Sequence, residues 1–146
     1  MESDQTAIAT LVHTERLNPF DLDWRRFVVA SDASGIVGAA QLRQHFDGSR
    51  ELGSLVVCRS ARSLGIASRL IDALLLRQRG RVFMITGSRY AAHYARWGFH
   101  RISPFDASLA VLGNYWLGRI AGIQNLLTGR KPKTLAVLRR SALATV

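Results

Sequence analysis

The segment from Val57 to Leu70, VCRSARSLGIASRL, constrains the fold more than any other part of the chain. An apolar, strand-like run ends at Val57, a loop of small and basic residues follows, and an amphipathic helix begins near Gly65. The first N–H groups of such a helix have no partner within it, and they lie at the positive end of its dipole. This order of elements therefore predicts an anion site suited to a pyrophosphate.

Individual loop residues fit that interpretation. Gly65 lets the backbone approach a ligand closely, Ala67 leaves the next turn uncrowded, and Arg62 can add a charge-assisted hydrogen bond. The alternative is an ordinary connection between a strand and a helix. The loop lacks the further glycines of a Rossmann fingerprint and the Gly-Lys-Ser/Thr of a P-loop, so those two nucleotide-binding classes fit poorly.

The size of the chain predicts one domain over residues 1–146, because 146 residues of which 48% are hydrophobic suffice for a single core. Cys58 is the only cysteine, which excludes an internal disulfide and gives no thiolate set for a metal. No metal is expected. The first residues lack a secretory signal pattern, and no run approaches the ~18 apolar residues of a membrane span. A cytoplasmic location is expected.

The charge is strongly positive, with a formal net charge of +10 and no Asp or Glu after Asp106. This balance favours a polyanionic partner. A phosphate-rich cofactor, a nucleic acid and an anionic membrane surface would all exploit it, and the charge alone does not choose among them.

Hydrophobic periodicity and turn residues predict an alternation of helices and strands. The Asp47-Gly48 pair predicts a hairpin turn, so the first three strands should form an antiparallel meander. The helix from Gly65 should end before Gly80, and Ser88 should cap the next helix. The expected helices are 4–16, 65–79, 89–97 and 109–128, and the expected strands are 25–30, 36–46, 51–57, 82–85 and 134–140.

Two spaced motifs resemble those of a known family. The pattern Arg62-x-x-Gly65-x-Ala67 is similar to the acetyl-coenzyme A motif of the GNAT N-acetyltransferases, and Tyr94-Ala-Arg-Trp-Gly98-Phe99 is similar to the motif that closes the family's next helix. The resemblance covers residues 25–102. It implies an α/β (α+β) fold with a mixed, mostly antiparallel twisted sheet flanked by helices. It also implies direct transfer of the acetyl group of acetyl-CoA to an amine in a ternary complex.

The resemblance implies roles for particular residues. Tyr94 corresponds to the acid that protonates the leaving thiolate. Glu51 stands eleven residues before Arg62, where several GNAT enzymes place a catalytic base. The alternative for Glu51 is a surface carboxylate paired with Arg50 or Arg43, and His45 is a reserve base or a solvated histidine. Cys58 is expected to pack. The implied cofactor contacts are Leu55, Val56, Val57, Arg62, Ser63, Leu64, Gly65, Ile66, Ala67 and Ser68.

Two departures from the family pattern leave alternatives open. The segment ahead of Ala7 hardly leaves room for the family's first strand, so the sheet is expected to be trimmed or completed by another chain in a homodimer. The basic amphipathic stretch 109–128, which carries an apolar stripe at helical spacing, is longer than usual and is interpreted as core or subunit contact, or as a surface for an anionic membrane or nucleic acid. Two other functions remain: a non-catalytic acetyl-CoA sensor and a nucleic-acid-binding domain. The acceptor, a small-molecule or peptide amine, is open.

Overall fold

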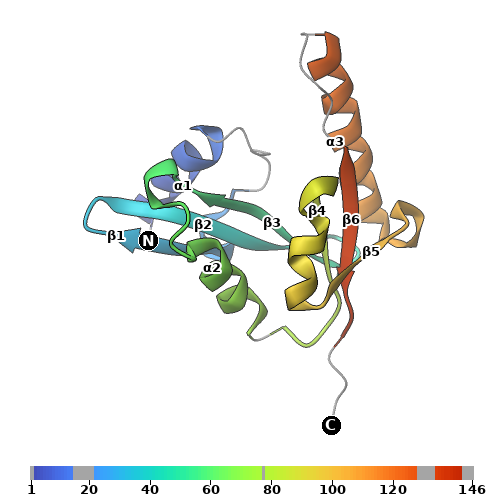
Figure 1. Ribbon diagram of the computed structural model, residues 1–146, viewed down its shortest axis with the longest axis horizontal. Helices are drawn as coiled ribbons and strands as arrows, with labels where there is room; N and C mark the ends of the chain where they lie inside the picture. Colours follow the sequence, from blue (N-terminus) through green and yellow to red (C-terminus); the bar gives the residue numbers. More distant parts are fainter. Residues whose placement is uncertain (1, 15–21, 77, 128–133, 143–146) are drawn as a thin grey trace. The chain divides into compact units, whose positions relative to one another are not determined.

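The computed structural model describes residues 2–14, 22–76, 78–127 and 134–142, and Figure 1 shows its ribbon. Contacts divide the chain into two compact units. The first comprises residues 1–43 and 52–78, and the second comprises residues 44–51 and 79–146. The mixed α/β architecture expected from the resemblance is confirmed, because each unit combines strands with flanking helices.

The first unit is built on an antiparallel meander. Strand β2 lies between β1 and β3, and Phe27 of β1 pairs with Gln41 of β2, which confirms the predicted meander. Within the described residues no strand precedes α1. The elements are α1 (Glu2–Thr14), η1 (Trp24–Arg26), β1 (Phe27–Asp32), β2 (Gly35–Gln44), β3 (Arg50–Val57), η2 (Arg59–Ala61) and α2 (Ile66–Leu75).

The helices α1 and α2 cover opposite faces of β2. Ile8 and Val12 of α1 are fully buried against Ala39, whereas its neighbour Gly38 lies beneath α2. Successive residues of a strand face opposite sides of a sheet, so the two helices lie on different sides. A Cβ atom at Gly38 would stand 3.0 Å from the Ile66 side chain. The glycine therefore permits α2 to approach the strand closely.

The second unit is centred on β6, which pairs antiparallel with both β4 and β5. Phe83 of β4 and Val137 of β6 pack with Val111 and Tyr115 of α3 in one core cluster. Besides the hairpin residues 44–51, the elements are β4 (Val82–Gly87), η3 (Ser88–Trp97), β5 (Phe99–Ile102), η4 (Pro104–Asp106), α3 (Leu109–Leu127) and β6 (Leu135–Arg140).

The hairpin tip between β2 and β3 holds the start of α3. The Asp47 carboxylate accepts hydrogen bonds from the Ser49 backbone N–H at 3.0 Å and from the Ala110 backbone N–H at 3.1 Å. The Ser108 hydroxyl donates to the Ser49 hydroxyl at 2.8 Å. Ala110 belongs to the first turn of α3, whose N–H groups have no partner within the helix. The turn predicted at Asp47-Gly48 is thus confirmed and also caps a helix.

Several predicted boundaries were wrong. Helix α2 ends at Leu75 rather than Arg79, because its buried stripe ends there and Leu76 is 83% exposed. The segment predicted as a helix over 89–97 is a 3-10 helix that begins at Ser88, and no side-chain hydrogen bond caps it, so the Ser88 cap was wrong. Strand β5 was not predicted. Residues 15–16 of the predicted first helix and residue 128 of the predicted last helix lie outside the described residues.

Across residues 2–14, 22–76, 78–127 and 134–142, no helix has the length and apolar character needed to cross a membrane.

Replacing Asp47 with alanine should loosen the start of α3. Asp32 provides a matched control, because it accepts the same pair of bonds from Ser34 in the other hairpin but none from a helix. We expect Asp47→Ala to lower the thermal unfolding midpoint more than Asp32→Ala, and to speed hydrogen exchange at the Ala110 amide. Equal effects of the two substitutions, with unchanged exchange at Ala110, would contradict this role.

The same contact predicts a pH dependence. Hydrogen bonds from Ser49 and Ala110 hold the pKa of Asp47 well below its usual range. A carboxyl group whose pKa is lower in the folded state contributes stability above its unfolded pKa of ~3.9 and loses it as the pH falls through the folded value. As the pH falls below about 4, the free energy of unfolding should decrease less in Asp47→Asn than in the wild type. Denaturant unfolding at several pH values measures this difference.

Candidate active site

The predicted anion loop has a backbone open to a ligand. Two residues with positive φ, Ser63 at +67° and Gly65 at +74°, lead the chain into the first turn of α2. Gly65 is the N-cap residue, and no side chain caps the helix. A Cβ atom at Gly65 would meet nothing within 4 Å, so the space in front of this turn is open. These features fit a pyrophosphate bound by the backbone N–H groups.

Arg62 is tethered to the strand that precedes the loop. Its Nε donates to the carbonyl oxygen of Val57 at 3.1 Å, and its backbone N–H donates to Arg59. The side chain is exposed, so the guanidinium lies at the protein surface beside the loop. A tethered arginine loses less freedom when it binds phosphate than an extended one does.

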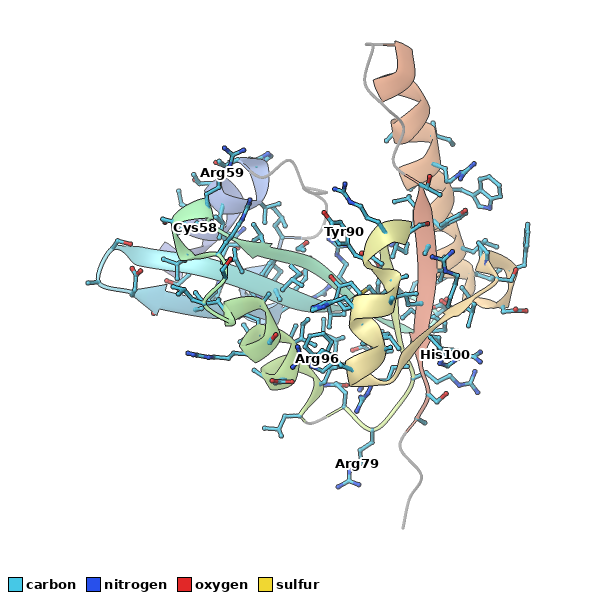
Figure 2. All side chains as sticks on the ribbon, viewed as in Figure 1. Cys58, Arg59, Arg79, Tyr90, Arg96 and His100 are labelled. Carbon is cyan, nitrogen blue, oxygen red and sulfur yellow. The ribbon has the colours of Figure 1, made fainter. Side chains whose placement is uncertain are left out.

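The remaining loop residues surround this turn. Leu64 is 63% exposed, while Ile66, Ala67 and Ser68 are half-buried in the first turn of α2. Cys58 and Arg59 mark the start of the connection in Figure 2, and the Cys58 sulfur lies 3.3 Å from the Ser60 hydroxyl. The Cys58 backbone N–H donates to Val37 of β2 at 2.8 Å, so the pairing of the sheet extends just beyond Val57.

Strand β3 has an unusual backbone conformation just before the predicted cofactor contacts Leu55 to Val57. Ser54 has φ = +51°, which is uncommon for a residue other than glycine within a strand. Its hydroxyl accepts hydrogen bonds from Gln41 Nε2 at 3.0 Å and Arg43 Nη2 at 2.8 Å. Both donors come from β2 and are buried. Of the three contacts, Val56 is buried, whereas Leu55 and Val57 are half-buried.

Glu51 is a buried carboxylate rather than a surface one. It is 4% exposed, and its Oε2 lies 2.8 Å from His45 Nε2 and 3.1 Å from Asn114 Nδ2. A surface glutamate was the alternative interpretation, and this burial contradicts it. The His45 side chain is 14% exposed, so it is not a solvated histidine either. When Glu51 is ionised, the hydrogen bond places the imidazole proton on Nε2.

Asn114 was missed by sequence reasoning. It lies 63 residues from Glu51 in a helix whose apolar stripe was its only evident feature. The hairpin contacts at the start of α3 bring it to the carboxylate. An uncharged polar residue within an apolar helix was the only available signal, and it does not identify a partner.

Tyr94 lies on η3 and is half-buried. Thr86 of β4 is hydrogen-bonded to its side chain, and its ring packs edge-on to Phe99 of β5 with centroids 6.5 Å apart. Burial raises the pKa of Tyr94 above its usual value of 10.0. The phenol therefore keeps its proton at neutral pH. Figure 2 shows Tyr90 and Arg96 on the same 3-10 helix.

Comparison with known proteins identifies the family. The model of the acetyltransferase (GNAT) domain matches residues 23–101, more than half of the chain. No curated protein sequence matches the chain. The chain belongs to the GNAT acetyltransferase family.

Solved structures agree in fold. N-acetylglutamate synthase from Neisseria gonorrhoeae, solved with coenzyme A and N-acetyl-glutamate, has a TM-score of 0.69 at 17% identity over 95% of this chain. The chain spans 33% of that synthase. A Mycobacterium tuberculosis protein solved with coenzyme A has a TM-score of 0.69 at 22% identity, over 98% of this chain and 96% of its own. A GNAT acetyltransferase from Staphylococcus aureus has a TM-score of 0.64 at 16% identity, over 96% and 94%.

Family membership gives the class of enzyme and its acetyl donor. The chain carries an acetyltransferase domain whose co-substrate is acetyl-CoA, as the resemblance implied. The open, uncapped start of α2 fits the pyrophosphate of that co-substrate. Among the described residues, no group of three His, Cys, Asp or Glu side chains is arranged to hold a metal ion.

Two substitutions of Gly65 distinguish the effect of side-chain charge on acetyl-CoA binding from the effect of side-chain shape. We expect Gly65→Asp to weaken acetyl-CoA binding by a factor of ten or more, because it adds an anion and a self-supplied cap where phosphate would bind. Gly65→Asn is the matched control, since asparagine has nearly the same shape, tolerates positive φ and carries no charge. Calorimetry of both variants measures the difference. Equal affinities for the aspartate and asparagine variants would contradict a phosphate at this turn.

Proposed function

We propose that the chain transfers the acetyl group of acetyl-CoA directly to an amine on a small molecule, with Glu51 as the general base and Tyr94 as the general acid. The burial of Glu51 between His45 and Asn114 is the observation that carries the proposal. Bound acetyl-CoA supplies an acetyl group that is activated as a thioester.

Glu51 supports the role of base through its environment. An alkylamine with a pKa near ~10.4 is mostly protonated at neutral pH, so it must lose a proton before it can attack a carbonyl carbon. The hydrogen bonds from His45 and Asn114 restrict the carboxylate to one orientation, and an ionised carboxylate is a proton acceptor. His45 donates a hydrogen bond from Nε2 to the same carboxylate, so it helps to hold the orientation of Glu51.

Tyr94 supports the role of acid through its protonation state. Because burial raises its pKa, the hydroxyl is a hydrogen-bond donor throughout the neutral range. Such a donor stabilises negative charge as it develops on a leaving sulfur and returns a proton to it. The bond to Thr86 and the packing on Phe99 restrict the positions that the ring can take.

The acceptor we propose is a free amino acid or a similar small amine. The gonococcal synthase of similar fold was solved with N-acetyl-glutamate in one structure and with L-arginine in another, each alongside coenzyme A. An assay of coenzyme release against a panel of amino acids, polyamines and peptide amines tests this class. Binding of acetyl-CoA without turnover of any amine would favour a non-catalytic sensor instead. Cytoplasmic location and a homodimer remain predictions.

The Glu51→Gln variant should lower kcat by a factor of about 100 or more while leaving acetyl-CoA binding unchanged, because glutamine keeps the shape but cannot accept the proton. Asn114→Ala is the comparison variant. It keeps the carboxylate and removes one hydrogen bond, so its loss in kcat should be smaller. Steady-state kinetics at several pH values measure both. Full activity of a folded Glu51→Gln protein would rule out this base.

The Tyr94→Phe variant should lower kcat by a factor of about 10 to 100, because it removes only the hydroxyl group. Tyr90→Phe is the matched control: Tyr90 lies on the same 3-10 helix and is 49% exposed. Its activity should match that of the wild type. If both variants lost activity equally, the effect would belong to the packing of η3, and the role of acid would be withdrawn.

A further inference from the structure

Helix α3 has an exposed apolar face opposite the one that packs in the core. Val111 and Tyr115 are buried in the second unit, and a Cβ atom at Gly118 would stand 3.0 Å from the Leu135 side chain of β6. On the opposite side Leu109 is 75% exposed, Trp116 46%, Leu117 64% and Ile120 55%. We call these four residues the outer face of α3.

The outer face is continuous along the helix. Residues 109, 113, 116 and 120 recur at intervals of four, three and four, which places them in one line on an α-helix, with Leu117 beside it. Gly113 lies on this line and adds no polar side chain to it. Phe105 of η4, immediately before the helix, is also 74% exposed. Clustered exposure of this kind marks an interaction site more often than scattered apolar residues do.

The positive charge of the chain favours an anionic partner for this face. Arg119 lies at its edge, with its guanidinium carbon 6.0 Å from the Tyr115 ring centre. The formal net charge of the chain is +10, and no Asp or Glu follows Asp106 in the sequence. A chain with this excess of positive charge is attracted to an anionic surface.

Two other partners fit less well. A second copy of the chain would bring together two molecules that each have a formal net charge of +10, which opposes association. A nucleic acid would match the charge, but its phosphates require hydrogen-bond donors, whereas the outer face presents leucine, isoleucine and tryptophan. A lipid bilayer with anionic headgroups matches both the apolar face and the positive charge, because its apolar interior lies beneath a negatively charged surface.

We propose that the outer face of α3 binds the surface of an anionic lipid bilayer, with the helix lying in the plane of the interface. Trp116 would then lie among the headgroups, where an amphipathic indole is favoured, and Leu117 and Ile120 would enter the acyl boundary. Asn114, on the other side of the same helix, would stay on Glu51. The proposal does not depend on the acetyl-transfer chemistry.

Flotation with vesicles tests the proposal. We expect the full chain to bind vesicles made of equal parts phosphatidylcholine and phosphatidylglycerol, and to bind phosphatidylcholine alone at least tenfold more weakly. Ile120→Gln and Leu117→Gln should each weaken binding by roughly tenfold, since each removes a large apolar side chain from the interface. Leu76→Gln is the matched control, because Leu76 is 83% exposed at the end of α2. Its binding should match that of the wild type.

Trp116 provides a second measurement. Binding to the anionic vesicles should shift tryptophan emission to the blue, and the shift should disappear in Trp116→Phe, which keeps an apolar ring and should still float. Circular dichroism and thermal unfolding should be unchanged in these variants, because their side chains lie outside the core.

Three results would overturn the proposal. One is absence of binding to anionic vesicles at low salt. The second is equal loss of binding in Leu76→Gln and Ile120→Gln. The third is a chain that is dimeric, or that binds duplex DNA, and loses that property in Ile120→Gln while its vesicle binding is unchanged, which would assign the face to a second copy or to nucleic acid.

Discussion

The contact between Asp47 and the first turn of α3 is the constraint on which the rest of the second unit depends. The Asp47 carboxylate, in the turn between β2 and β3, accepts a hydrogen bond from the backbone N–H of Ala110, which lies 63 residues later in the chain. That contact fixes where α3 begins, and hence which side of the helix faces the hairpin. Asn114 lies one turn further on and reaches Glu51 at the other end of the same hairpin. The turn thus organises the surroundings of the proposed base without taking part in the chemistry.

Burial of Glu51 has an energetic cost that hydrogen bonding must offset. Removing an ionised carboxylate from water costs several kcal/mol unless partners replace the lost hydration. His45 and Asn114 supply two such partners. A second polar group lies in the first unit, where Ser54 receives hydrogen bonds from the buried side chains of Gln41 and Arg43. Buried polar groups of this kind reduce stability relative to an apolar core, and they are more common at functional sites than elsewhere.

Local sequence patterns predicted the features whose causes are local. The loop from Arg62 to Ala67 follows from a strand, a glycine and a helix start that are contiguous in the chain, and the turn at Asp47-Gly48 follows from two adjacent residues. The positive φ of Ser54 has no such signal, because serine is not a residue that favours it. The approach of Asn114 to Glu51 depends on tertiary contacts across 63 residues, which periodicity cannot show. The 3-10 geometry of η3 likewise escapes a helical pattern, since α and 3-10 segments share similar spacing over one or two turns.

Gly38 shows how a residue far from any ligand can set the properties of a binding loop. Because Gly38 has no side chain, α2 packs close to the strand. A Cβ atom at this position would lie 3.0 Å from the Ile66 side chain and 3.2 Å from the Leu70 side chain. Ile66 is the first residue of the helix whose amides face the proposed phosphates. The depth at which that helix rests on the sheet therefore determines how far those amides project toward a donor molecule. A methyl group at Gly38 would push the helix away from the sheet. The affinity for the donor would then change through a residue that does not contact it.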